Sequence, residues 1–117
     1  MKGDAMEKVT GIGGVFIKAD DAPALRDWYR DHLGVDVDPS YGGAMFGDTA
    51  WSIFPATTKY FDKPCMVNYR IGDLDAMLAQ LRGAGVTVDE KVDDTEYGRF
   101  GWALDPEGNR IELWQPK

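Results

Sequence analysis

Glu112 is the residue of this sequence best placed to do chemistry, because it stands in an alternating segment of polar and aliphatic residues. In RIELWQ, Arg110, Glu112 and Trp114 fall on one face of an expected strand. Ile111 and Leu113 fall on the other face, so the carboxylate points away from the aliphatic core. Such a carboxylate can act as a general base, or it can anchor a cationic or hydrogen-bonding ligand. The alternative is a carboxylate that is paired with a nearby cation and does no chemistry.

The element that must position Glu112 is a β-hairpin over residues 97–116. Two alternating segments flank the turn sequence DPEGN. Pro106 suits the start of a type I turn, and Gly108 can adopt the left-handed conformation that closes it. The turn therefore sets the register of the hairpin and with it the face on which Glu112 lies.

Two similar series of elements precede this hairpin. The first is a strand over 14–19, a helix over 22–33 that begins after Asp21 and ends at Gly34, a short strand at 35–37 and a hairpin over 44–54. The second is a strand over 66–71, a helix that begins after Asp73 and ends at 83–85, and a short strand at 86–88. The chain is therefore predicted to be a single domain, residues 1–117, with internal repeats at about 11–56 and 64–116 and the order β-α-β-β-β in each.

The segment DPEGNRIELWQP resembles the closing hairpin of the vicinal oxygen chelate superfamily, which includes glyoxalases, bleomycin-resistance proteins and extradiol dioxygenases. GIGGVFIKADDAPALRDWYRDHLG and VNYRIGDLDAMLAQLRGAGVTV extend the resemblance to nearly the whole chain. It implies an α+β fold in which two βαβββ modules form a cupped mixed or antiparallel sheet with the helices on its outer face. It also implies that the modules pair within one chain or by exchange between two chains.

Strand parity then identifies the side chains that face the cup, because the aliphatic residues of each strand must cover a helix. Glu112 is the candidate catalytic residue. The expected ligand-binding residues are Phe16, Lys18, Ser52, Phe54, Met66, Asn68, Arg70, Arg110 and Trp114. Six more aromatic residues either form a stacking wall for a flat ligand or pack in the core and at a dimer contact: Trp51, Tyr60, Phe61, Tyr97, Phe100 and Trp102.

Metal-binding members of the superfamily take their ligands from four strand positions, and the resemblance places these at Gly14, Ser52, Met66 and Glu112. Only Glu112 is a strong donor for a hard divalent ion, because glycine has no side chain and a thioether or hydroxyl binds weakly. The one histidine, His32, lies near the end of the first helix, away from the cup. We therefore expect no catalytic metal and no cofactor, unlike glyoxalase I and the ring-cleaving dioxygenases.

Composition narrows the partners of the chain. A formal charge of −7 over 117 residues disfavours nucleic acid and anionic membranes as partners. No apolar segment approaches the roughly 18 residues of a spanning helix, and MKGDAMEKVT lacks the apolar centre of a secretory signal, so we expect a cytoplasmic protein. The single cysteine, Cys65, cannot form an internal disulfide and is expected to be a buried structural thiol.

Three functions remain open at this point. The first is metal-independent binding of a small organic molecule in the cup of a homodimer, as in the drug-sequestering bleomycin-resistance proteins. The second is a lyase, isomerase or dioxygenase-like enzyme that uses Glu112 as an acid/base or metal ligand, so that catalysis itself is undecided. The third is a structural or regulatory dimer that binds no ligand.

Overall fold

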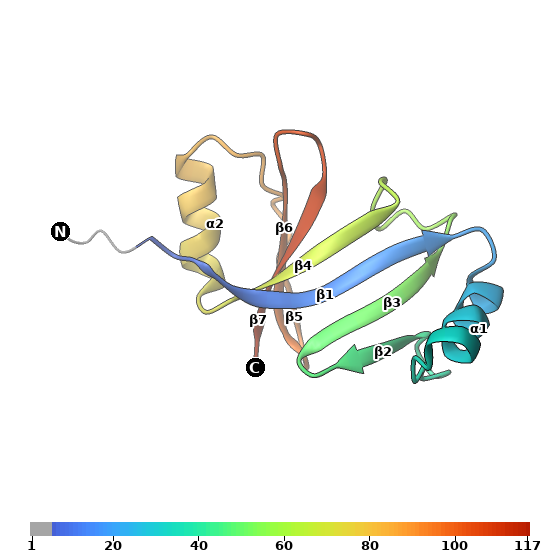
Figure 1. Cartoon of the computed structure of the whole chain (residues 1–117). Helices are drawn as coiled ribbons and strands as arrows, with labels where there is room; N and C mark the ends of the chain where they lie inside the picture. The colour runs from blue at the N-terminus through green and yellow to red at the C-terminus, as the bar shows by residue number, and fades with distance from the viewer. Residues whose placement is uncertain (1–5) are drawn as a thin grey trace.

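A single curled sheet of seven strands forms the centre of the computed structural model, which describes residues 6–117 (Figure 1). The strands lie in the order β2-β3-β1-β4-β7-β6-β5. No helix of the described part is long and apolar enough to cross a membrane. The elements are β1 (Val9–Ala19), α1 (Ala22–Leu33), β2 (Gly43–Phe46), β3 (Thr49–Pro55), β4 (Cys65–Ile71), α2 (Leu74–Gly83), β5 (Asp93–Thr95), β6 (Gly98–Leu104) and β7 (Arg110–Pro116).

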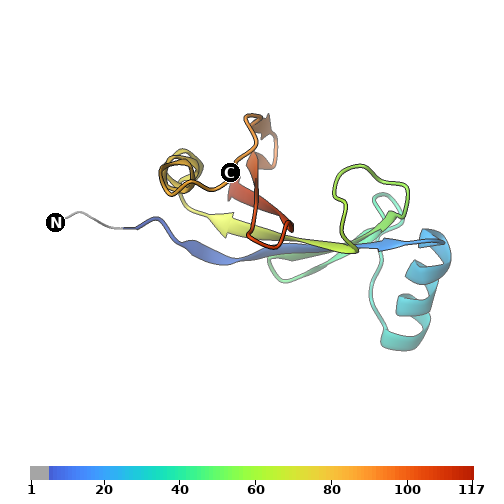
Figure 2. The same ribbon diagram turned by 90° about the horizontal axis from the view of Figure 1, so that it is seen from above.

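The two halves of the chain use the same strand pairing. In the first half β1 pairs parallel with β3, and in the second half β4 pairs parallel with β7. The halves join edge to edge within one chain, because β1 also pairs antiparallel with β4. The helices α1 and α2 lie at opposite ends of the sheet (Figures 1 and 2). This arrangement confirms the predicted α+β fold with a cupped mixed sheet.

The helix boundaries and the closing hairpin follow the local signals in the sequence. Helix α1 begins after Asp21, whose carboxylate accepts a hydrogen bond from the Ala24 amide, and it ends at Gly34 with φ 66°. Strands β6 and β7 pair antiparallel around the predicted turn. In that turn Gly108 has φ 82°, and its amide donates to the carbonyl oxygen of Asp105 at 3.0 Å. These predictions are confirmed.

The short strands predicted at 35–37 and 86–88 are wrong, because isolated bridges replace them. Val35 donates its backbone N–H to Tyr29 at 3.2 Å, and Val37 donates to Val35 at 3.0 Å, so neither donor is available to a neighbouring strand. The bridges are Asp38 with Gly43 and Val88 with Ala103. Strand β5, which pairs with β6, was not predicted.

The first strand begins earlier than the predicted strand over 14–19. Strand β1 already begins at Val9, and Val9 pairs with Ile71 of β4. Residues 1–5 lie outside the described part of the chain. The first strand is therefore longer than its alternating pattern indicated.

Cys65 is exposed, so the prediction of a buried thiol is wrong. Alternate residues of β4 become more buried along the strand, from exposed Cys65 through half-buried Val67 and Tyr69 to buried Ile71. The cause is the position of α2, whose side chain Leu74 packs with Ile71 at the far end of this strand. The cysteine begins the strand at the uncovered end.

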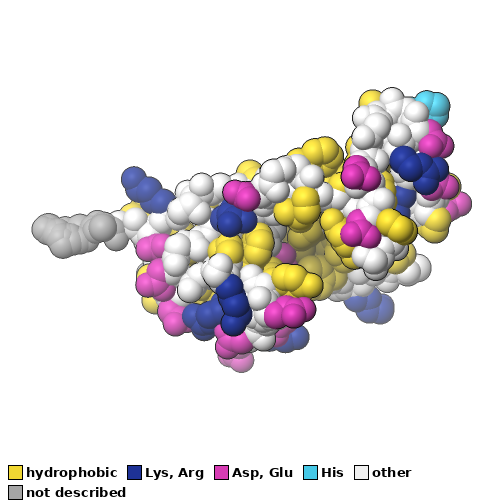
Figure 3. Space-filling model, turned by 90° about the horizontal axis from the view of Figure 1, so that it is seen from below, with side chains coloured by type: hydrophobic (Ala, Val, Ile, Leu, Met, Phe, Trp, Pro, Cys, Tyr) yellow, Lys and Arg dark blue, Asp and Glu magenta, His cyan; other side chains and the backbone are white. Residues whose placement is uncertain are grey.

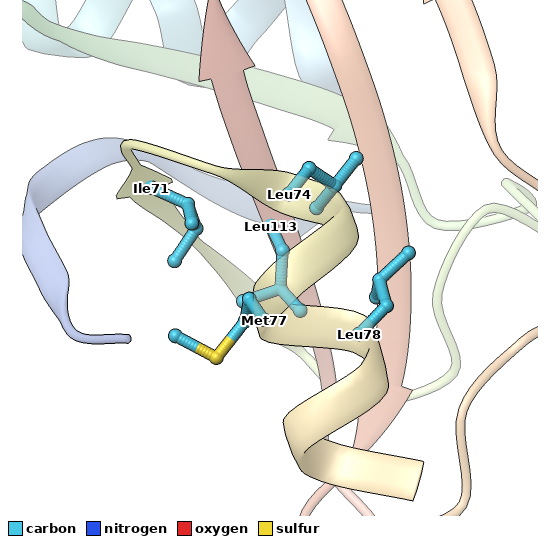
Figure 4. Close-up of a cluster of buried hydrophobic side chains, with 5 residues drawn as sticks. All are labelled: Ile71, Leu74, Met77, Leu78 and Leu113. Carbon is cyan, nitrogen blue, oxygen red and sulfur yellow. The ribbon is translucent and has the colours of Figure 1, made fainter. Parts of the chain in front are cut away.

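The hydrophobic core is concentrated in the second half of the chain. Figure 4 shows Leu74, Met77 and Leu78 of α2 against Ile71 and Leu113 of the sheet, and all five side chains are buried. Burial of one such side chain contributes about 1.5–3 kcal/mol, so this cluster anchors β4 and β7 firmly.

Helix α1 is attached to the first half differently. Ala22 is its one buried residue. The Arg26 guanidinium instead donates to the carbonyl oxygens of Ile53 at 2.7 Å and Gly42 at 3.1 Å. The rings of Tyr29 and Trp51 meet edge to face, with centroids 5.0 Å apart. Trp51 therefore packs beneath the helix and lies away from the cup.

Candidate functional site

Glu112 lies at the floor of the cup, by which we mean the concave side of the sheet that carries this residue. Strand pairing places Asn68 of β4 on one side of Glu112 and Trp102 of β6 on the other. The three side chains are almost fully buried, with exposed fractions of 3% for Glu112, 2% for Asn68 and 3% for Trp102. Buried polar side chains of this kind require hydrogen-bond partners.

Three neutral donors bind the Glu112 carboxylate. Asn68 Nδ2 donates to Oε2 at 2.6 Å, and Trp102 Nε1 donates to Oε1 at 3.0 Å. The Tyr60 hydroxyl also donates to Oε1. The alternative in which Glu112 pairs with a cation does not match this geometry, since no lysine or arginine of residues 6–117 forms a salt bridge with it. The carboxylate is held by dipoles rather than by an opposite charge.

Tyr60 reaches Glu112 from the irregular segment between β3 and β4. Its ring lies parallel to that of Phe54, with centroids 6.1 Å apart. Arg110 fixes the segment, because its Nη1 donates to the carbonyl oxygen of Tyr60 at 2.9 Å and its guanidinium lies 5.4 Å from the Tyr60 ring centroid. Arg110 thus positions Tyr60 and does not itself touch Glu112.

Burial raises the pKa of the Tyr60 hydroxyl well above its usual value of 10.0, and the negative charge and hydrogen bond of Glu112 raise it further. Both effects favour the neutral phenol, because a phenolate would place a second negative charge beside the carboxylate. Tyr60 therefore remains a hydrogen-bond donor at physiological pH and is unsuited to act as a base.

Tyr60→Phe will make the protein less sensitive to alkaline pH. Since the folded-state pKa of Tyr60 is raised, its contribution to stability is complete below pH 10.0 and is lost as the pH rises toward the folded-state value. The unfolded chain loses this proton first. Above pH 10.0 the free energy of unfolding of the wild type will therefore fall by about 1 kcal/mol per pH unit, a value that allows for the partial exposure of the Tyr60 ring. The variant has no Tyr60 hydroxyl and will not show this fall.

Urea unfolding at about pH 9 and about pH 11 measures this difference. Tyr41→Phe is the control, because it removes an exposed tyrosine hydroxyl and leaves Tyr60 in place. The explanation fails when wild type and Tyr60→Phe lose equal stability between the two pH values.

Two adjoining hollows open above Glu112. The larger has a volume of about 560 Å³ and the smaller about 350 Å³, and both are lined by Phe16, Phe100 and Glu112. Figure 3 shows hydrophobic side chains gathered around a hollow on one face of the molecule. The larger hollow is also lined by Gly13, Tyr41, Met45, Ala50, Asn68, Tyr97 and Trp114. Asn68 and Glu112 are thus its two polar side chains other than tyrosine.

Asn68 is only half satisfied. Its Nδ2 donates to Glu112, but its Oδ1 is buried without any hydrogen-bond partner among the described residues. The oxygen points toward Gly13, where a Cβ atom would overlap it. Only a glycine at this position leaves the space that Oδ1 occupies.

The structure distributes the predicted ligand-binding residues unevenly. Phe16, Asn68 and Trp114 line the larger hollow with Glu112, and Phe54 lines the smaller one. Met66 is 1% exposed and pairs with Phe16 across β1 and β4. It lies below the surface of the hollow.

Ser52 and the predicted cations lie outside the lining of the hollows. Ser52 pairs with Gly43 of β2 and with Phe16 of β1. Lys18 Nζ donates to the carbonyl oxygen of Asp62 at 3.1 Å. The Arg70 guanidinium lies 4.9 Å from the Trp114 ring centroid, at the edge of the cup. The structure therefore brings together an aromatic and amide site, with the positive charges around it.

The sequence did not indicate the roles of several residues of the site. The contact of Tyr60 with Glu112 has no periodic signal, because Tyr60 lies outside a strand or helix. Tyr41, Met45 and Ala50 enter the cup because β2 and β3 curl toward it. Among the aromatic residues considered for a stacking wall, Tyr97, Phe100 and Trp102 line the hollows, whereas Phe61 is buried with an exposed fraction of 2%.

The residues around Glu112 do not fit a metal ion. Its three partners present N–H and O–H groups, whose positive ends face the carboxylate and would also face a cation. No three His, Cys, Asp or Glu side chains within residues 6–117 come together as a group that could hold a metal.

Comparison with known proteins gives one family and several similar structures. The model of the glyoxalase-like domain matches residues 14–114. A methylmalonyl-CoA epimerase from Mycobacterium tuberculosis has a TM-score of 0.68 and 24% identity, over 100% of this chain and 93% of that chain. A glyoxalase/bleomycin resistance protein/dioxygenase superfamily member from Vibrio splendidus 12B01 has a TM-score of 0.68 and 11% identity, over 93% and 98%.

A variant of the Streptomyces coelicolor methylmalonyl-CoA epimerase has a TM-score of 0.69 and 20% identity, over 93% of this chain and 99% of that chain. No curated protein matches the sequence. At these identities the similar structures support the fold alone. Together with the domain match they confirm the resemblance to the vicinal oxygen chelate superfamily.

Proposed function

Because this chain belongs to the glyoxalase-like domain family, we propose that it binds a small, flat organic molecule in the cup without a metal. The observation that carries the proposal is the larger hollow of about 560 Å³, walled by aromatic side chains above a buried amide and carboxylate. Ligand sites of this size are characteristically apolar with a few fixed polar groups. The proposal places the ligand against Phe16, Phe100 and Trp114.

The aromatic walls favour a flat ligand. The rings of Phe100 and Trp114 lie parallel, with centroids 5.7 Å apart, and Arg70 covers part of the Trp114 ring. Phe16 and Phe54 meet edge to face at 5.6 Å. Rings held in this way offer contact area while losing little conformational freedom on binding. A cup filled by the protein's own side chains would instead have favoured a structural dimer that binds no ligand.

One observation favours a second function, an enzyme of the lyase or isomerase type. Glu112 is dry, lies in a concave site and has no cationic partner among the described residues. Its Oε1 accepts from both Tyr60 and Trp102, but Oε2 accepts only from Asn68 and retains one lone pair. A substrate proton could be taken by that oxygen. Glu112→Gln would then abolish turnover while uncharged aromatic compounds still bind.

Filling the cup will abolish ligand binding. Ala50→Trp places an indole in the larger hollow, so we expect at least a tenfold loss of affinity for uncharged bicyclic aromatic compounds. Binding is measured by calorimetry and by amide chemical-shift changes in labelled protein. Ala56→Trp is the matched control, because Ala56 is exposed and lies outside both hollows. Equal binding by the two variants would place the ligand elsewhere.

The proposal includes a homodimer as the working form. Apolar side chains at the mouth of the cup are half exposed or more: Tyr41 at 50%, Met45 at 55% and Tyr97 at 68%. The molecule measures 53 × 27 × 23 Å, and such an extended form leaves this patch uncovered. A second copy of the chain would cover it.

Sedimentation equilibrium is expected to give twice the chain mass at micromolar concentration. Met45→Asp should shift the protein to the monomer, because it places a charge in the patch. Leu33→Asp is the control at the exposed end of α1. A wild-type monomer, or equal masses for the two variants, would contradict this part of the proposal.

A further inference from the structure

Asn68 Oδ1 is a buried acceptor without a donor among the described residues, on a side chain that lines the hollow where the proposed ligand binds. The side chain is 2% exposed and lines the larger hollow together with Gly13 and Glu112. A buried acceptor without a partner is unfavourable, so native structures pair such atoms with protein, water or ligand. The free atom therefore marks the point at which a ligand hydrogen bond stabilises the complex.

Glu112 determines which end of the Asn68 amide faces the ligand. The carboxylate can only accept hydrogen bonds, so the amide must turn its NH₂ group toward Oε2, at 2.6 Å. The carbonyl oxygen is then directed to the opposite side, toward Gly13. The Glu112 carboxylate thus determines that Asn68 presents its oxygen, and not its NH₂ group, on the side away from Glu112.

The position of Oδ1 depends on Gly13. A Cβ atom at this position would overlap Asn68 Oδ1 and would lie 2.9 Å from Trp114 Cε3. The same strand offers a contrast in Gly11, where a Cβ atom would meet only Arg70 Cδ, at an ordinary 3.7 Å. Gly13 therefore lets the asparagine oxygen and the tryptophan ring pack directly against strand β1.

We infer that the cup selects flat, uncharged ligands that carry an N–H or O–H donor, and that Asn68 Oδ1 accepts this hydrogen bond. The inference rests on the proposed function, because it concerns the ligand of the same cup. Ligand carboxylates are disfavoured, since Glu112 already places a negative charge at the floor. Cyclic amides, indoles and phenols have the required combination of ring and donor.

Three bicyclic compounds of nearly the same shape test the donor. Indole has an N–H group, indene has a CH₂ group at that position, and benzofuran has an acceptor oxygen. Calorimetry is expected to show that indole binds about tenfold more tightly than indene, and that benzofuran binds more weakly than indole. Chemical-shift changes at the Asn68 side-chain NH₂ and the Gly13 amide show whether binding occurs at this position.

The outcomes separate the two proposals. Equal affinity for the three compounds at the cup would overturn the donor inference and leave cup binding standing. Tighter binding of benzofuran would also overturn it, because the amide would then present its NH₂ group. Binding of none of the three would contradict the proposed function and the inference together.

Gly13→Ala should remove the preference for indole over indene, whereas Gly11→Ala should retain it. Thermal melts show whether each variant is folded. The wild-type comparison of the three compounds decides the question if Gly13→Ala does not fold.

Glu112→Gln gives a sharper test, because it should reverse the preference. The glutamine oxygen can still accept from Tyr60 and Trp102, and its new NH₂ group then faces Asn68. Asn68 must turn its oxygen toward that group, which directs its own NH₂ toward Gly13. Benzofuran should now bind more tightly than indole, while the affinity for indene stays within about twofold. An unchanged preference for indole in the folded variant would overturn the inference.

Discussion

Replacing Glu112 with leucine will lower the free energy of unfolding by about 3 kcal/mol or more, because three donors in the floor of the cup lose this acceptor at once. The Tyr60 hydroxyl, the Asn68 NH₂ group and the Trp102 N–H all donate to this carboxylate. The Trp102 N–H keeps the Tyr60 hydroxyl oxygen as a partner at 3.2 Å, but the Asn68 NH₂ group and the Tyr60 hydroxyl are left unpaired, at about 1–3 kcal/mol for a buried donor. The loss outweighs the gain from removing a buried charge, since the remaining groups stay polar and dry.

Urea unfolding at neutral pH measures this loss. Glu112→Gln should cost about 1 kcal/mol, because its oxygen still accepts from Tyr60 and Trp102, and the Asn68 amide can turn its own oxygen toward the new NH₂ group. Glu107→Leu is the control for a carboxylate replaced at the surface, as Glu107 is exposed in the hairpin turn. Stability losses that are equal for the leucine and glutamine variants would show that the three donors find other partners.

Gly98→Ala will lower the free energy of unfolding by about 3 kcal/mol, because the new methyl group meets backbone atoms that cannot move aside. Gly98 has φ 127°, a conformation that residues with a side chain rarely adopt. Its Cβ would overlap the carbonyl oxygen of Gln115 and lie 2.9 Å from Pro116 Cα on the paired strand β7. Relief of this overlap would separate the strands that position Trp114.

Gly108→Ala is the matched comparison. Gly108 also has a positive φ, 82°, but nothing lies within 4 Å of its added Cβ. Gly108→Ala should lower the free energy of unfolding by only about 1 kcal/mol, the cost of placing alanine in this backbone conformation. The difference between the two variants in urea unfolding isolates the steric overlap. Equal losses would mean that β7 moves to accommodate the methyl group.

Local signals accounted for much of the fold. The N-cap residue Asp21, the αL glycine Gly34 and the DPEGN turn each satisfy backbone groups of their own segment, so their effect is readable without knowledge of the rest. Strand alternation likewise placed Asn68 and Glu112 on the cup face, and the pairing of β4 with β7 makes them neighbours. These features depend on contacts between residues close in the chain, or on the alternation of side chains between the two faces of a strand.

The remaining features depend on contacts that no period encodes. Tyr60 meets Glu112 only because an irregular segment folds back over the sheet, and a segment without regular structure leaves no pattern in the sequence. Arg110 has the predicted parity, yet its long side chain bends toward Tyr60 and Asp89, with 3.7 Å between its guanidinium and the Asp89 carboxylate. Strand parity predicts the face of the sheet from which a side chain leaves the backbone. It does not predict where the end of a long side chain lies.

Cys65 shows a related limit. Its type suggested burial, but burial depends on which part of β4 the helix α2 covers, and that follows from the packing of Leu74 on Ile71. The same holds for the orientation of the Asn68 amide, which is set by a partner 44 residues away in the chain. Such facts appear only when both halves of the sheet are in place.

The unequal anchoring of the two helices gives the cup two sides of different stiffness. Helix α2 buries Leu74, Met77 and Leu78 beneath the sheet, whereas α1 buries only Ala22. Segments with few buried apolar contacts open at lower free energy, so the amide hydrogens of α1 should exchange with solvent sooner than those of α2. The β2–β3 side can then move outward while the Asn68–Glu112 pair stays fixed. The proposed site can thus admit ligands of different bulk, provided that each places its polar atom beside Asn68.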